Sequence, residues 1–236
     1  MQKVSNFINK YRKHLFLSLV LILIAGLAEG IVTIHYDKLL QEPIAAGNLF
    51  TIRPVYNDDG SWYHAKIGIG YIRGLLLIEN IAALLMAWFL YYYMDVWGWF
   101  FGMRSFWLYV FDFVFAPTLY RLFHNVLGIY TLDYIRIVGR RSTSTYDFPD
   151  FYLFISAAGI LIWFVMALIP YYKYKHTQVK GMRYLTKFIW ELKLAITFIR
   201  AVFVPRKQWP EFFEKAGFPL QYHKDSSDSD KSTARQ

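Results

Sequence analysis

The sequence predicts an all-α, polytopic helical membrane protein with about four transmembrane helices and an amphipathic helix near its C-terminus. Hydrophobic residues make up 56% of the 236 residues and aromatic residues 20%. These residues come in blocks, whereas a soluble domain interleaves them with charge. Several blocks reach the roughly 20 residues that a helix needs to cross the roughly 30 Å hydrocarbon layer.

The first predicted span covers 15–34 and follows a basic N-terminal segment, 1–14. Basic flanks are typical of the cytoplasmic side of a membrane. A cleaved signal peptide, with its cut after Ala28, is the alternative interpretation. The apolar run continues past Ala28 to Ile34, and this length favours an uncleaved anchor.

Three more spans are predicted at 71–93, 98–120 and 151–172. The aromatic residues around Asp95 predict a tight turn between the second and third spans, because Trp and Tyr favour the headgroup level. Two outer loops are expected at 35–66 and 121–150, the second with a surface helix over Leu122–Arg141. Asp147, Pro149 and Asp150 suit a loop that leads into a helix N-terminus.

A basic cytoplasmic region is predicted at 173–224. Within it, 182–204 repeats apolar residues at helical spacing: Leu185, Phe188, Leu192, Ile196, Ile199 and Phe203. Charged residues lie away from that stripe, which predicts a helix in the membrane interface. A fifth span is the alternative. The Ser- and Asp-rich stretch 225–236 is expected to be a disordered tail.

The charge pattern predicts topology and partners. The net charge is +9, and the basic clusters before the first span and after the fourth predict that both termini are cytoplasmic. The same clusters predict contact with anionic lipid at that face. Nucleic acid is not an expected partner. The sequence favours a bacterial cytoplasmic membrane.

Four ionisable residues fall inside the predicted spans: Glu29, Arg73, Glu79 and Asp112. Such groups cost several kcal/mol each in lipid unless they are paired or hydrated, so they form the candidate intramembrane polar site. Depth along each span places all four in the outer half of the bilayer. A structural salt bridge and a transport or ligand site are both open as roles.

Small residues occur at similar depth. Gly26 and Gly30 form one GxxxG pattern, and Gly70 and Gly74 form another. This pattern lets helix backbones approach closely, so these glycines are predicted helix-packing positions.

Catalytic and cofactor motifs do not emerge from the sequence. The chain has no cysteine, which excludes thiol catalysis and Cys-based metal sites. The histidines lie in flanks or loops without zinc or haem spacing, so no metal or cofactor is expected. The sequence therefore favours a subunit or accessory protein of a larger membrane complex, without catalytic chemistry of its own. An ion- or proton-coupled transporter component is the alternative.

Overall fold

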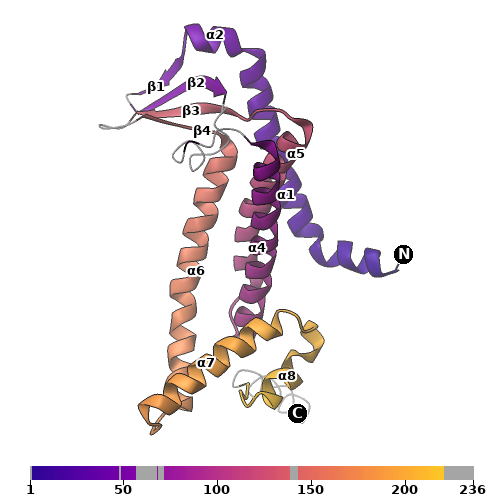
Figure 1. The fold of residues 1–236 in the computed structure, drawn as a ribbon, viewed down its shortest axis with the longest axis vertical. Coiled ribbons are helices and arrows are strands. Elements are labelled where there is room, and N and C mark those ends of the chain that lie inside the picture. Colours follow the sequence, from indigo (N-terminus) through magenta and orange to yellow (C-terminus); the bar gives the residue numbers. More distant parts are fainter. Residues whose placement is uncertain (1, 48, 57–67, 69–71, 139–142, 221–236) are drawn as a thin grey trace, which may run out of the picture. The chain divides into compact units, whose positions relative to one another are not determined.

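The computed structural model describes residues 2–47, 49–56, 68, 72–138 and 143–220 (Figure 1). In chain order the elements are α1 (Gln2–Ile34), α2 (Tyr36–Gln41), β1 (Ile44–Ala46), β2 (Phe50–Tyr56), α4 (Arg73–Phe100), η1 (Ser105–Phe111), α5 (Asp112–Leu127), β3 (Leu132–Val138), β4 (Thr143–Tyr146), α6 (Phe148–Gln178), α7 (Tyr184–Ala201), η2 (Arg206–Gln208) and α8 (Trp209–Lys215). The predicted tail, 225–236, lies outside the described residues.

Four segments of this described part are long and apolar enough to cross a membrane: Tyr11–Ile34, Arg73–Phe100, Ser105–Leu127 and Phe148–Gln178. Each overlaps one predicted span, so the predicted class of helical, multi-pass membrane protein is confirmed. The chain divides into two compact units. The first contains Met1–Ala87 and Tyr109–Ala158, and the second contains Trp88–Leu108 and Gly159–Gln236.

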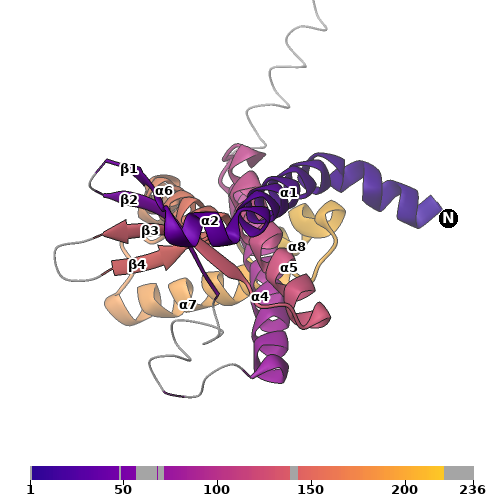
Figure 2. The ribbon, with the colours of Figure 1, turned by 90° about the horizontal axis from the view of Figure 1, so that it is seen from above.

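An antiparallel sheet in the order β1-β2-β3-β4 belongs to the first unit (Figure 2). Thr51 of β2 pairs with Arg136 of β3, which in turn pairs with Thr145 of β4. The register shifts between Ile52 and Val55. Pro54 falls in this irregular stretch, where a residue without an N–H group costs no ladder hydrogen bond.

Helices α1, α5 and the beginning of α6 pack together in the first unit. Leu21 and Ala25 of α1 are buried with Ala116 and Tyr120 of α5. Tyr152 of α6 joins this core and donates its hydroxyl to the carbonyl oxygen of Leu21 at 3.3 Å. The packing leaves the outward faces of these helices apolar, as a lipid environment requires.

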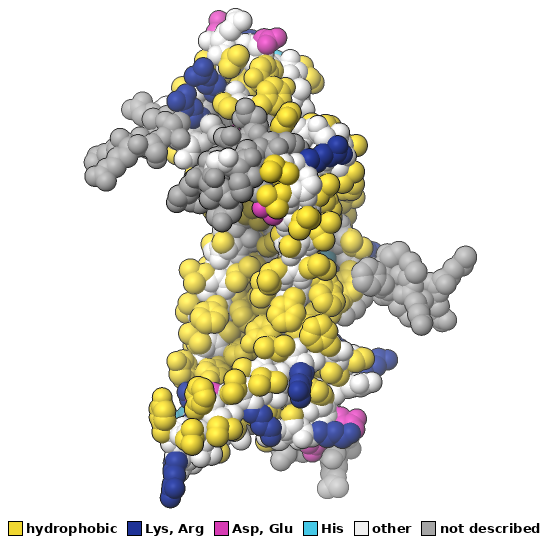
Figure 3. Space-filling view, in the orientation of Figure 1, with side chains coloured by type: hydrophobic (Ala, Val, Ile, Leu, Met, Phe, Trp, Pro, Cys, Tyr) yellow, Lys and Arg dark blue, Asp and Glu magenta, His cyan; other side chains and the backbone are white. Residues whose placement is uncertain are grey.

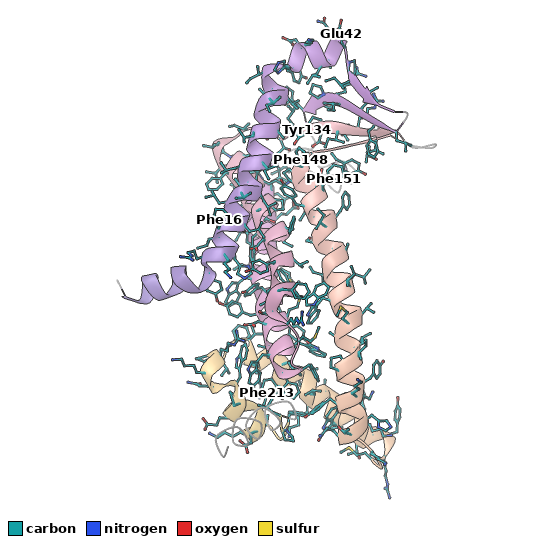
Figure 4. All side chains as sticks on the ribbon, turned by 180° about the vertical axis from the view of Figure 1, so that it is seen from behind. Phe16, Glu42, Tyr134, Phe148, Phe151 and Phe213 are labelled. Carbon is teal, nitrogen blue, oxygen red and sulfur yellow. The ribbon has the colours of Figure 1, made fainter. Side chains whose placement is uncertain are left out.

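A second small core attaches the sheet to these helices. Val32 of α1, Leu39 of α2, and Leu132 and Tyr134 of β3 are buried together. Tyr134 packs against Phe148, the first residue of α6, with 6.0 Å between the ring centroids (Figure 4). The sheet therefore lies beside the C-terminal end of α1 and the N-terminal end of α6. We call this end of the spans the sheet end.

The expected surface helix over Leu122–Arg141 was wrong. Helix α5 ends at Leu127 because Gly128 adopts a positive φ of 72°, and the amide of Ile129 bonds back to the His124 carbonyl at 2.9 Å. Leu132–Val138 then forms β3, whose alternating residues suit a strand with one buried face. Likewise the expected outer loop 35–66 contains α2, β1 and β2.

The turn between the second and third spans also lies later than predicted. Helix α4 continues through the aromatic residues to Phe100. The chain then reverses at Gly102, whose φ of 68° is readily adopted only by glycine. The third span accordingly runs over Ser105–Leu127 instead of 98–120.

The second unit is built around aromatic side chains. Phe100, Phe198 and Phe213 are buried together, and Figure 4 labels Phe213 on α8. The buried indole of Trp209 donates to two carbonyl oxygens, that of Ala201 at the end of α7 at 3.1 Å and that of Val204 in the following turn at 2.9 Å. A buried Trp N–H needs such an acceptor, so Trp209 fixes the turn from α7 to α8.

Helix α7 has two apolar faces. Leu194, Phe198 and Ala201 are buried in the second unit. On the opposite side the stripe predicted from the sequence is exposed, from 42% at Ile196 to 68% at Phe203 (Figure 3). At about 100° per residue, Lys193 and Arg200 flank this stripe. The arrangement favours an interfacial helix whose exposed stripe enters lipid. Within the described residues α7 is also not among the candidate spans.

Single cysteines in a chain without native cysteine test this position of α7. In intact membranes, cysteines that replace Leu192 or Ile196 should resist a water-soluble thiol reagent, because lipid covers the stripe. Cysteines that replace Lys193 or Arg200 should react. Detergent should expose all four. Protection at all four positions in membranes would instead indicate a fifth span.

Candidate functional site

Glu29 is joined to α5. Its Oε2 atom accepts a hydrogen bond from the Tyr120 hydroxyl and lies 3.3 Å from His124 Nε2. Both Glu29 and His124 are largely buried, with 14% and 16% of their side chains exposed. Tyr120 and His124 are four residues apart and therefore share one face of α5. Glu29 thus has a defined pair of partners close to the end of α1.

The contacts of His124 fix the position of one proton. Its Nδ1 atom lies 3.0 Å from the Tyr120 carbonyl oxygen, which can only accept, so Nδ1 carries a hydrogen. Its Nε2 atom faces the Glu29 carboxylate. A hydrogen bond there requires a proton on Nε2 or on the carboxyl group. The His124–Glu29 pair therefore holds one proton in either case.

Asp112 belongs to a different pair at the other end of α5. It is 1% exposed and is the first residue of that helix. Its carboxylate lies 3.0 Å from His14 Nδ1 and accepts a hydrogen bond from Ser18 at 3.3 Å. The His14 ring also stacks on Tyr109, with 4.5 Å between centroids. Asp112 therefore anchors the N-terminal part of α1 to α5.

Arg73 caps the C-terminus of α5. Its Nε donates to the Asn125 carbonyl oxygen at 2.7 Å, and its Nη2 donates to that of Val126. A cation at a helix C-terminus satisfies free carbonyls and complements the helix dipole. Glu79 is exposed on α4. It lies six residues after Arg73, and so about 240° further around the helix. The four ionisable residues are thus distributed over separate contacts.

The predicted packing glycines differ in their surroundings. A Cβ atom added to Gly26 would make an ordinary van der Waals contact with the Tyr120 ring at 3.8 Å, so Gly26 faces α5 but a Cβ atom would fit there. Cβ atoms at Gly30 and Gly74 would have no described atom within 4 Å. Gly70 lies outside the described residues.

Three carboxylates that the sequence did not assign to a functional site gather at the sheet end. Asp133 of β3, Asp147 before α6 and Asp150 in its first turn each offer an oxygen, and these atoms lie within 4.8 Å of one another. We call them the aspartate cluster. Asp147 is 3% exposed, whereas Asp133 and Asp150 are only partly buried. The cluster therefore combines one buried carboxylate with two that water can reach.

Part of this cluster is a helix cap. The Asp150 amide donates to Asp147 Oδ1 at 2.8 Å, and the Asp147 amide donates to Asp150 Oδ2 at 3.2 Å. These reciprocal bonds are a capping box for α6, and they confirm the predicted helix N-terminus. Arg121 of α5 donates to both carboxylates, at 3.3 Å to Asp147. A cap and an ion pair account for Asp147 and Asp150, but not for Asp133.

Asp133 adds a third negative group to a site that has one arginine. Burial, then repulsion by Asp150, raises the pKa of Asp133 to about 6, although Arg121 and a 3.4 Å hydrogen bond from the Thr145 hydroxyl oppose the shift. Burial also raises the pKa of Asp147, to about 7. Both carboxyl groups therefore exchange protons near neutral pH.

This arrangement can hold protons or a cation. Three carboxylate oxygens suit a hard divalent ion, but Arg121 already donates to two of the three residues. A proton needs no rearrangement of those bonds. The sequence contained only weak signals of the site: Arg121 and His124 fell in a predicted loop, and Asp133 is a lone acid in an apolar stretch.

No protein-family model matches the chain, and the comparison with curated proteins gave no match. Among solved structures, the chain is similar to one described as a bacterial membrane enzyme, solved by the in meso method at 2.3 Å resolution. The TM-score is 0.46 with 15% sequence identity, over 72% of this chain and 93% of that chain.

The raised pKa of Asp133 predicts how stability depends on pH. An aspartate in the unfolded chain has a pKa near 3.9. Between about pH 4 and 6 the folded protein therefore binds more protons, and the free energy of unfolding falls as pH rises. Asp133→Asn should weaken this dependence and raise stability at pH 7 by on the order of 1–2 kcal/mol.

Thermal unfolding in an uncharged detergent at pH 4.5 and 7 measures this effect. Asp37→Asn, at an exposed position on α2, is the matched control. If both variants change with pH to the same extent, Asp133 does not hold the proton.

Proposed function

We propose that this multi-pass membrane protein is an acid–base hydrolase, with the aspartate cluster as its catalytic centre. The observation that carries the proposal is the third carboxylate, Asp133, held beside two others with its pKa raised to about 6. General acid–base catalysis works best with groups whose pKa lies near the working pH. Strongly perturbed carboxyl groups are also concentrated at functional sites.

The roles follow from exposure and contacts. Asp133 donates its proton to the departing group of the substrate. Asp150, 25% exposed and hydrogen-bonded to Arg121, accepts a proton from the attacking water. The hydroxide that remains from the water bonds to the substrate as the scissile bond breaks. Asp150 then holds one proton and Asp133 has lost one, and proton exchange with water restores both groups. Asp147, with 5% of its side chain exposed, holds Arg121 and the start of α6 in position.

The basic clusters at both ends of the chain support a topology for this proposal. With four spans and cytoplasmic termini, the sheet end faces outward from a bacterial cytoplasmic membrane. The substrate would then be a bond presented at the outer membrane surface, where Asp133 and Asp150 meet water.

Proton-coupled transport is the second candidate, and the His124–Glu29 pair favours it. Both groups lie on spans and share one proton, and such intramembrane pairs are typical of proton pathways. Proton uptake into vesicles that depends on Glu29 and His124 but not on Asp133 would favour transport over hydrolysis.

A subunit role in a larger complex is compatible with either activity. The exposed apolar faces of the spans support it, because they need lipid or neighbouring helices. Purification in mild detergent should then recover other chains together with this one. A lone chain would contradict that role.

Hydrolysis can be tested before the substrate is identified. The full chain is reconstituted into vesicles of bacterial membrane extract in heavy-oxygen water, and new products that carry the heavy oxygen are sought by mass spectrometry. The wild type and Asp37→Asn should generate such products. Asp133→Asn should reduce them by roughly 100-fold, the contribution of a general acid.

Two results would contradict the proposal. One is an equal yield of labelled products from Asp133→Asn, and the other is a wild type that generates none. Unfolding of the variant is checked separately by its thermal midpoint, which should be no lower than that of the wild type.

A further inference from the structure

A pocket of about 500 Å³ lies at the sheet, and Arg121 is not among the described residues that line it. It is lined by Tyr36, Leu40, Arg53, Pro54, Val55, Tyr56, Arg136 and Thr145. We call it the arginine pocket. Its volume falls in the range of sites that bind small molecules. The proposed hydrolysis gives this pocket no role.

The charged side chains among the described lining residues are both positive. They are Arg53 and Arg136, and no described lining residue is acidic. Both arginines are half-buried, and within the described part of the chain neither forms an ion pair. A partly buried guanidinium gains most from an anionic partner. Two of them in one pocket therefore favour an anion with several acceptor oxygens.

The remaining walls are aromatic and apolar. Tyr36 of α2 and Tyr56 of β2 stack with 5.2 Å between their centroids. Leu40 and Val55 are exposed beside them, at 40% and 43%. An apolar or ring-shaped body next to the anion would cover these groups. The Thr145 hydroxyl, which also lines the pocket, donates to Asp133 at 3.4 Å.

We propose that the arginine pocket binds a phosphate ester. Arg53 and Arg136 hold the phosphate oxygens with charge-assisted hydrogen bonds, and Tyr36 and Tyr56 contact the group that carries the phosphate. The phosphate belongs either to a lipid headgroup or to a soluble ester, since both present the same oxygens. Neither arginine is part of the aspartate cluster, so this inference is independent of the proposed hydrolysis.

Ligand-dependent thermal unfolding of the full chain in uncharged detergent tests the pocket. The probes are glycerol phosphate, short-chain phosphatidylglycerol and short-chain phosphatidylcholine, with chloride at equal ionic strength as the reference. A phosphate probe should raise the unfolding midpoint in a saturable way. Saturation by glycerol phosphate indicates a soluble ester, whereas a requirement for acyl chains indicates a lipid.

Variants assign the effect to the pocket. The change Arg53→Gln with Arg136→Gln should raise the half-saturating concentration at least tenfold, because charge-assisted hydrogen bonds are lost. The matched control Arg200→Gln, at an exposed position of α7, should leave this concentration unchanged. Arg53→Lys with Arg136→Lys should weaken binding to an intermediate degree, since lysine lacks the planar fork. No saturable effect in the wild type, or equal saturation in the glutamine variant, would overturn the proposal.

Discussion

The guanidinium of Arg121 joins the end of one span to the beginning of the next. It bonds to Asp147 and Asp150, which also cap α6. Leaving one partner of such a network alone and desolvated costs several kcal/mol, so α5, the cap and the arginine must assemble together. Strands β3 and β4 connect these two points. The position of the sheet therefore follows from the same ion pairs.

The last turns of α5 hold α1 as well. Tyr120 and His124 face Glu29, while Arg121, about 100° around the helix, faces α6. Gly128 ends the helix at a point where an added Cβ would meet Arg73 Nη1 at 3.3 Å. The last turns of α5 thus hold α1 and α6 in place and set the start of β3. They also bring the His124–Glu29 pair and the aspartate cluster together next to the sheet.

Hydropathy predicted the four spans because the free energy of membrane insertion is a sum over about 20 residues. The apolar stripe of α7 and the helix cap at Asp147 were also predictable, because each depends on residues that are close together in the sequence. The sheet was not predictable, since β2 and β3 pair across a long separation in sequence and both are short. The four ionisable residues of the predicted site lie in separate contacts for a geometric reason. Depth along a span says nothing of rotation about its axis, and the third span was placed seven residues too early, which left His124 outside it.

The charge of the groups around Arg121 distinguishes an acid–base site from a structural one. Among these groups, Glu29 and the aspartate cluster contribute four carboxylates, against Arg121 and at most one charge on His124. Full ionisation would leave two uncompensated negative charges close together, which is costly where water is scarce. Raised pKa values at Asp133 and Asp147 relieve this cost with protons near neutral pH. A helix cap needs only Asp147, Asp150 and Arg121, and burial already raises the pKa of its Asp147. Asp133 is not needed for the cap, and it adds a second carboxyl group that gains and loses a proton near neutral pH.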